Sequence, residues 1–258
     1  MWARMEASKS FKAIGVIPAR LGSTRLAEKV LRPIHGKPMI QHVWERASGA
    51  RSLSDLIVAC DDPRILDCVV SFGGKALLTR QDHPNGSSRV AEVASKREGD
   101  LFLNIQGDEP MMHPAGIDDL VEAMRNHPEI PVGTLAVRRN LDADYENPNV
   151  VKVVCSTGGN ALYFSRSPLP YYREKNVSTG DACVAPTYLK HLGIYGYRRD
   201  FLLQFVTWPI GFLEDREKLE QLRILERDFA IRVVETAYDS WSVDTAEDLR
   251  LVEAKLKS

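Results

Sequence analysis

The chain has few cysteines and no long apolar run, and each absence excludes a class of protein. Its four cysteines, Cys60, Cys68, Cys155 and Cys183, show no CxxC spacing and no neighbouring histidines that would suggest a metal site. This pattern favours a reduced protein of the cytoplasm over a disulfide-rich secreted one. No segment approaches the roughly 18 uninterrupted apolar residues of a membrane span, and the first 12 residues hold no signal-peptide core. We therefore expect a soluble, cytoplasmic protein.

An excess of charge of one sign is also missing. The 34 lysines and arginines are balanced by 35 aspartates and glutamates, which leaves a formal net charge of -1. A chain with so little net charge has no long-range attraction for nucleic acid or for an anionic membrane, so we expect neither as a partner. Any argument about ligands must therefore rest on local clusters of charge.

Short β-branched runs alternate with helical periods over the first half of the chain. Runs at 13–17, 55–60, 75–79 and 101–105 are predicted strands, and each is followed by a polar turn and an amphipathic helix. After about residue 130 the predicted strands follow one another with too little helix between them. A long charged helix is predicted over 213–227, and a terminal helix over 245–257. The pattern predicts an α/β fold with a mostly parallel, doubly wound, Rossmann-like sheet and a mixed-strand insertion at about 130–210, in a single domain spanning 1–258.

The loop after the first predicted strand gathers positive charge. In open parallel sheets ligands bind outside the carboxyl ends of the strands, and here Arg20, Arg25 and Lys29 surround Gly22 at such an end. The sequence is neither a Walker A loop nor GxGxxG. Backbone amides near Gly22 and Ser23, together with the three cations, would nevertheless suit a triphosphate. A solvated surface loop with scattered salt bridges explains the same spacing, and spacing alone does not decide between them.

Two aspartates stand at other predicted loop positions. Asp108 lies in QGDEP beside Gly107, directly after the fourth strand, and Asp244 lies in SVDT before the last helix. A carboxylate at the end of a buried strand suits Mg²⁺ on a polyphosphate, but a lone aspartate is more often a helix cap or turn residue. Both aspartates together with the cationic loop would complete a metal and triphosphate site.

Seven motifs occur in order between about residues 13 and 252. They are IPARxGSTRxxxK, TRxDH followed by a glycine and an arginine, NIQGDEPM, ALYFSR, HLGIYGYR, LEQLR and VDTxEDL. With these motifs the chain resembles the 3-deoxy-manno-octulosonate (Kdo) cytidylyltransferases, the CMP-Kdo synthetases of lipopolysaccharide precursor synthesis. The opening loop is shared with CMP-sialate synthetases and other sugar nucleotidyltransferases, whereas HLGIYGYR with LEQLR narrows the match to the Kdo branch. The resemblance implies a nucleotidyltransferase fold and a homodimer, for which the region 130–210 offers a surface.

The resemblance also implies a reaction. The anomeric hydroxyl of Kdo attacks the α-phosphorus of CTP and yields CMP-Kdo and pyrophosphate, which requires in-line positioning and charge neutralisation. By resemblance, Arg20, Arg25 and Lys29 bind the phosphates, with Lys29 nearest the α-phosphate, and Asp108 and Asp244 hold Mg²⁺.

The other family positions divide between the two substrates. Those implied for the nucleotide are Gly22, Ser23, Arg80, Gly86, Ser87 and Asp108. Those implied for the sugar acid are Gln106, Arg166, His191, Tyr195, Glu220 and Gln221. Without the resemblance, a surface turn would explain the nucleotide segment 84–86, packed core groups would explain His191 and Tyr195, and a solvated helix face would explain Glu220.

Two segments depart from the family pattern. LAEKV stands where LPGKP is usual, so Glu28 replaces a glycine and Ala27 and Val30 replace prolines, which predicts a loosened or reshaped loop around Lys29. In the nucleotide segment Ser88 replaces the usual acid. These departures favour a nucleotide-binding homologue without activity, and retention of the lysine and both aspartates favours an enzyme. A related sugar acid, 8-amino-Kdo or a sialic acid, remains an alternative substrate.

Overall fold

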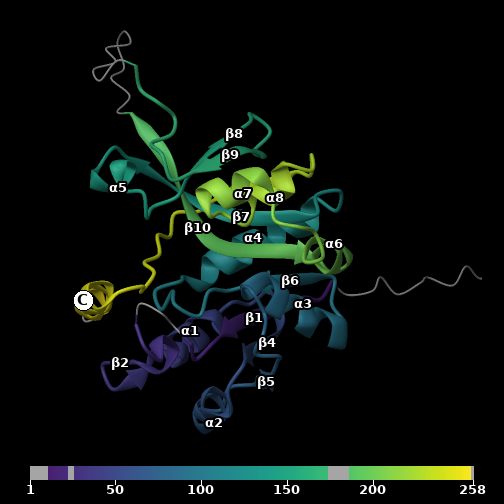
Figure 1. Cartoon of the computed structure of the whole chain (residues 1–258), viewed down its shortest axis with the longest axis vertical. Helices are drawn as coiled ribbons and strands as arrows, with labels where there is room; N and C mark the ends of the chain where they lie inside the picture. Colours follow the sequence, from purple (N-terminus) through teal and green to yellow (C-terminus); the bar gives the residue numbers. More distant parts are fainter. Residues whose placement is uncertain (1–10, 23–25, 174–185, 257–258) are drawn as a thin grey trace, which may run out of the picture.

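The computed structural model describes residues 11–22, 26–173 and 186–256. Within them one twisted sheet has the strand order β11-β7-β10-β6-β1-β4-β5 (Figure 1). Its parallel half consists of β1 (Ala13–Ala19), β4 (Leu53–Cys60), β5 (Ala76–Leu78) and β6 (Leu101–Asn104). The four runs predicted from the sequence are thus strands, and their carboxyl ends share one edge of the sheet.

The other half of the sheet has mixed strand directions. It contains β7 (Val132–Asn140), β8 (Lys152–Cys155), β9 (Ala161–Ser165), β10 (Thr187–Arg198) and β11 (Ile231–Glu235). Strand β10 is antiparallel to β6, β7 and β8, whereas β11 is parallel to β7. The predicted fold class, a mostly parallel sheet with a mixed-strand insertion, is confirmed.

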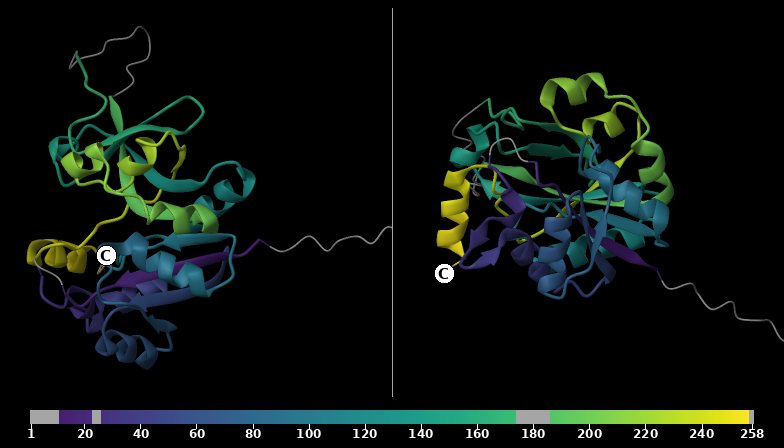
Figure 2. Two further views of the ribbon diagram at one scale, coloured as in Figure 1. Left: turned by 45° about the vertical axis from the view of Figure 1, so that its right-hand side comes forward. Right: turned by 60° about the horizontal axis from the view of Figure 1, so that its bottom comes forward.

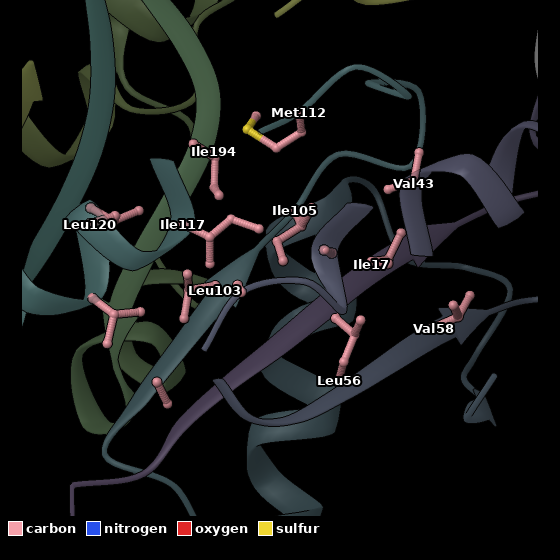
Figure 3. Packing of buried hydrophobic residues seen from close by; sticks show 14 of the residues in the cluster. Ile17, Val43, Leu56, Val58, Leu103, Ile105, Met112, Ile117, Leu120 and Ile194 are labelled. Carbon is pink, nitrogen blue, oxygen red and sulfur yellow. The ribbon is translucent and has the colours of Figure 1, made fainter. Parts of the chain in front are cut away.

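Helices cover both faces of the sheet. One face carries α1 (Met39–Ala47) and α4 (Pro114–Asn126), and the opposite face carries α3 (Gly86–Lys96) and α6 (Arg199–Phe205). Helix α2 (Pro63–Ser71) packs beside β4 and β5. Figure 3 shows the first interface, where Ile17 and Ile105 from the sheet meet Val43 from α1 and Ile117 from α4, all fully buried. Burial on two faces explains why β1 reads as a continuous apolar run.

A third, smaller core joins segments that are far apart in the sequence. Hairpin β2–β3 (Pro33–Ile34 and Lys37–Pro38) contributes Ile34, and α9 (Ala246–Lys255) contributes Val252 (Figure 2). The hairpin turn places His35 and Gly36 at φ 47° and 81°, as a two-residue turn of this kind requires. Because Lys29 precedes the hairpin and Asp244 precedes α9, this core draws the two residues together.

One predicted element is wrong. The charged segment 213–227 is not one helix but two, α7 (Phe212–Glu217) and α8 (Leu222–Leu225). Lys218 ends α7 in a left-handed conformation at φ 53°. The spacing of apolar residues does not predict such a conformation at a lysine. The short helix α5 (Ala143–Glu146) was not predicted. No helix in the described part of the chain is long and apolar enough to cross a membrane.

Candidate active site

A cleft of about 340 Å³ opens at the carboxyl ends of β1 and β6. Six of the residues predicted for the site line it: Arg20, Lys29, Gly86, Gln106, Asp108 and Asp244. The predicted residues Ser23 and Arg25 lie outside the described residues. Gly22 is described but does not line the cleft. The cleft thus lies at the carboxyl ends of the parallel strands, where the sequence predicted a ligand site.

Lys29 lies between the two predicted metal carboxylates. Its Nζ donates to Asp108 Oδ2 at 2.6 Å and to Asp244 Oδ1 at 2.9 Å. Burial opposes the charge of the ammonium group, but attraction and hydrogen bonds from the two carboxylates outweigh burial and raise the pKa of Lys29. Lys29 is thus a fixed positive charge. It contacts two carboxylates that lie 79 and 215 positions further along the chain.

A tight backbone turn directs Lys29 into the cleft. Lys29 begins the short 3₁₀ helix η1 (Lys29–Leu31), and Glu28 before it adopts φ 53° and ψ 37°. This left-handed region costs a residue with a Cβ about 1–2 kcal/mol and suits glycine. The turn explains why glycine is usual in the family at this position, and Glu28 keeps it. The Glu28 carboxylate points outward and accepts a hydrogen bond from Arg64 Nη1 at 2.9 Å.

The two aspartates are held together by their backbones. Asp108 follows Gly107, where an added Cβ would lie 2.8 Å from the Pro18 carbonyl oxygen, so a side chain would clash. The N–H of Val243 donates to the Asp108 carbonyl at 2.8 Å. The segment ending in Asp244 therefore docks on the loop after β6 and places both carboxylates at the cleft.

The donor set at the cleft fits Mg²⁺ that binds together with a polyphosphate. In the described ranges no group of three or more histidines, cysteines or acids could hold a metal ion. Mg²⁺ in phosphate-binding enzymes commonly takes one or two carboxylates and fills its other positions with phosphate oxygens and water. Asp108 and Asp244 could supply those two carboxylates, and both contact Lys29.

The departure at Ser88 preserves a helix cap. Asn85 Oδ1 accepts the Ser88 N–H at 2.9 Å, and Ser88 Oγ accepts the Asn85 N–H at 3.4 Å, which together form a capping box at the start of α3. An acid at this position could make the same reciprocal contact. The substitution thus leaves the amino end of α3, including Gly86, in the wall of the cleft.

Sequence reasoning missed two ionisable side chains in the cleft wall, Arg89 and His83. Arg89 is 3% exposed, and its Nη1 donates to Thr79 Oγ1 at 2.6 Å and to the Arg80 carbonyl at 3.1 Å. His83 Nε2 lies 2.6 Å from Glu92 Oε2. Both stand in the TRxDH…G…R motif, which was the available signal. The predicted residue Arg80 does not line the cleft; its side chain pairs with Asp82.

Burial works against the charge of Glu92, but several donors reverse the effect. Hydrogen bonds from Lys96, from His83 and from the Arg80 N–H lower the pKa of Glu92 to about 2. The carboxylate therefore stays ionised next to His83 in the cleft wall and fixes the orientation of that ring.

Glu220 connects the predicted sugar and nucleotide segments. Its Oε1 accepts from Asn85 Nδ2 at 2.8 Å, and its Oε2 accepts from Ser87 Oγ at 2.7 Å. Burial raises the pKa of Glu220 above its ordinary value, although both hydrogen bonds favour the ionised form. Glu220 thus holds the first turn of α3, and sequence reasoning did not anticipate this contact.

Gln106 links the cleft to the insertion. Its Nε2 donates to the Gly193 carbonyl at 3.0 Å, where β10 changes register against β7 between Leu192 and Tyr195. Close to this bend, His191 Nε2 lies 3.0 Å from Thr134 Oγ1. Burial lowers the pKa of His191 to about 3, so this ring is neutral.

Five predicted sugar residues do not line the described cleft: Arg166, His191, Tyr195, Glu220 and Gln221. Tyr195 packs against the His191 ring with centroids 5.4 Å apart. Arg166 donates to the carbonyls of Glu217 at 2.8 Å and Pro148 at 2.9 Å. The sugar-binding roles of these residues stay predictions.

Comparison with known proteins identifies the class. A family model described as Cytidylyltransferase matches residues 14–231. A cytidylyltransferase from Leptospira borgpetersenii shares the fold at a TM-score of 0.63, with 15% identity over 96% of this chain and 87% of that one. The family model covers most of the chain and thus identifies it as a cytidylyltransferase.

The comparisons also identify the branch within this class. The 3-deoxy-manno-octulosonate cytidylyltransferase of Geobacter sulfurreducens is 49% identical over 94% of this chain and 98% of its own, and that of Solibacter usitatus is 48% identical over 96% and 95%. A structure of CMP:2-keto-3-deoxy-manno-octonic acid synthetase complexed with CTP superposes with a TM-score of 0.88 and 45% identity, covering 95% of this chain and 98% of that one. The chain belongs to the 3-deoxy-manno-octulosonate cytidylyltransferase family.

Proposed function

We propose that this chain transfers CMP from CTP to Kdo, forming CMP-Kdo and pyrophosphate for lipopolysaccharide synthesis. The observation that carries the proposal is Lys29 held between Asp108 and Asp244 at the strand ends of a nucleotidyltransferase fold. The names of relatives that match nearly the whole chain, and the CTP bound in a similar solved structure, support the choice of substrates.

The cleft offers the nucleotide two chemically different ends. Lys29, Arg20 and the two aspartates would bind the triphosphate, while Gly86 and Arg89, which line the same cleft, would receive the base. A Cβ at Gly86 would approach Pro18 Cγ to 3.2 Å, so glycine keeps this end open. A small pyrimidine held against backbone groups fits such a wall.

The residues at the phosphate end can stabilise an in-line displacement. As the sugar hydroxyl attacks the α-phosphorus, negative charge grows on the phosphate oxygens, and a preorganised ammonium group lowers the barrier. Lys29 supplies that charge, and Arg20 adds a second cation in the same wall. Asp108 and Asp244 would hold Mg²⁺, which when bound would screen the triphosphate and acidify the sugar hydroxyl. A dedicated strong base is then unnecessary.

The proposal includes a cytoplasmic homodimer. In support, the region 130–210 exposes large apolar side chains, with Leu162 at 62% and Tyr171 at 82% exposure. Monomeric proteins also expose single apolar residues, so the oligomeric state is tested by measuring the mass in solution. A mass measured by light scattering at twice 28.9 kDa is the expected result, and a monomer at working concentration would contradict it.

The decisive experiment measures pyrophosphate release from CTP and Mg²⁺ with Kdo, 8-amino-Kdo and sialic acid in parallel. Kdo should give the highest kcat/KM. A preference for 8-amino-Kdo would correct the sugar and leave the reaction intact. No pyrophosphate release with any sugar, combined with a melting temperature that CTP and Mg²⁺ leave unchanged, would refute the proposed activity and favour an inactive homologue.

A further inference from the structure

Asp244 is carried by a connection that has neither helix nor strand. Residues 236–245 run from β11 to α9 (Figure 1). Such a connection loses conformational entropy when it adopts one path. Its path must therefore be imposed by contacts with its surroundings, and the position of Asp244 depends on them.

A buried ion pair holds the middle of this connection. Asp239 Oδ1 lies 2.9 Å from Lys190 Nζ, and its other carboxylate oxygen pairs with Arg139 Nη1. The Lys190 and Asp239 side chains are only 10% and 12% exposed. Lys190 also donates to the Ser240 carbonyl at 3.2 Å. Both cations come from the insertion, Arg139 from β7 and Lys190 from β10.

Three other contacts fix the rest of the connection. The Tyr238 ring stacks on His113 with centroids 3.8 Å apart and an interplanar angle of 2°. The Trp241 ring lies 5.3 Å from Lys190 Nζ and packs against the small core between the hairpin and α9. The Val243 N–H reaches the loop that contains Asp108. Lys190 takes part in both the ion pair and the Trp241 contact, so this residue ties the connection to β10.

Strand β10 brings the sugar side of the site into the same network. Lys190 directly precedes His191, and two residues further on the Gly193 carbonyl accepts the hydrogen bond from Gln106 in the cleft wall. One strand therefore touches the cleft at Gln106 and holds the connection that carries Asp244. A displacement of β10 would therefore move both Gln106 and the connection that carries Asp244.

We propose that Lys190 and Asp239 are a positioning pair, which holds Asp244 beside Asp108 and makes the affinity for Mg²⁺ depend on the insertion. The inference rests on the proposed function, since it takes Asp244 as a metal carboxylate. A buried ion pair adds little net stability compared with apolar residues of similar volume. Its effect is thus on the geometry of the connection, and removing it should change metal affinity more than folding.

The test replaces Asp239 by asparagine and titrates Mg²⁺ calorimetrically into the CTP complex, without any sugar acid. Partners behind metal ligands typically contribute 10–100-fold to metal affinity, and because this pair acts through the backbone we expect about tenfold weaker binding. CTP affinity without metal should be unchanged. Asp200→Asn is the matched control, since Asp200 is 97% exposed on α6. Equal Mg²⁺ affinity in Asp239→Asn and wild type would overturn the proposal.

Two more variants separate positioning from folding. Asp239→Glu should recover most of the Mg²⁺ affinity because it restores the charge opposite Lys190. The double variant Lys190→Met with Asp239→Leu should keep its melting temperature and still bind Mg²⁺ weakly; wild-type affinity in it would overturn the pair. If the wild type makes no CMP-Kdo but binds Mg²⁺ with CTP, the proposed function fails while these titrations still decide. A wild-type CTP complex that binds no Mg²⁺ would overturn both the metal role and the pair.

Discussion

Replacing Lys29 by methionine keeps an unbranched side chain that is one atom shorter and removes the charge between two carboxylates. Lys29 makes hydrogen bonds of 2.6 and 2.9 Å to Asp108 and Asp244. Hydrogen bonds between charged groups contribute about 1.5–3 kcal/mol each. The carboxylates are 26% and 36% exposed, so water compensates for much of the loss. We expect the free energy of unfolding without ligands to fall by about 1–2 kcal/mol.

Turnover should change much more than stability. Lys29 would act on charge that develops during phosphoryl transfer, and loss of one preorganised group of this kind typically lowers kcat by about 10²–10³-fold. Binding of Mg²⁺ without CTP should instead become tighter, because the ammonium group no longer occupies carboxylate oxygens. A competing interaction of about 1.4 kcal/mol corresponds to about tenfold in affinity.

The assay combines pyrophosphate release with calorimetric titration of Mg²⁺ into the free protein. Lys37→Met is the matched control, because Lys37 also binds a carboxylate, that of Glu45 at 2.8 Å, but on the surface with 49% exposure. The control should lose neither turnover nor Mg²⁺ affinity. A drop in kcat below about tenfold for Lys29→Met, where a preorganised charge predicts far more, would refute the catalytic role. Weaker Mg²⁺ binding would refute the competition with the metal.

Three further changes test separate parts of the site. Asp108→Asn should abolish turnover while the protein stays folded, and unchanged turnover would remove Asp108 from the metal role. Glu28→Gly should raise the free energy of unfolding by about 0.5–1 kcal/mol with turnover retained, since glycine relieves the left-handed strain; a lower melting temperature would contradict this. Glu92 has a folded pKa of about 2 against an ordinary value of 4.5, so its contribution is present above pH 4.5 and is lost as the pH falls toward 2. Denaturation series over this range should show a shallower pH dependence for Glu92→Gln, and equal slopes would count against the pKa shift.

The parallel half of the fold could be predicted because burial leaves a simple trace in the sequence. A strand covered on both faces, such as β1 with Val16 and Ile17 in opposite cores, reads as a continuous apolar run. The break between α7 and α8 could not be predicted in this way. Lys218 adopts a left-handed conformation, which a lysine in the sequence does not predict. The charge pattern on both sides of it continues with helical spacing.

The cleft residues at the strand ends could be predicted from the sequence, whereas the contacts of Glu220 could not. Strand topology puts Lys29 and Asp108 at one edge of the sheet, so local position was sufficient for them. The contact between Glu220 and Ser87 joins residues 133 positions apart, and no local pattern encodes it. Ser23 and Arg25 lie outside the described residues, so their roles stay predictions.

The substitutions around Lys29 change how its loop is held rather than where it points. Val30, which replaces a proline, is 5% exposed and packs in the core below the cleft. Leu26 packs against the small core of the hairpin and α9, and Arg32 Nε donates to the Ala27 carbonyl at 3.0 Å. Prolines stiffen a loop through the backbone of the unfolded chain as well as the folded one. Here burial on both sides of η1 does that work in the folded state, so the lysine keeps its position between the carboxylates although the usual glycine and prolines are absent.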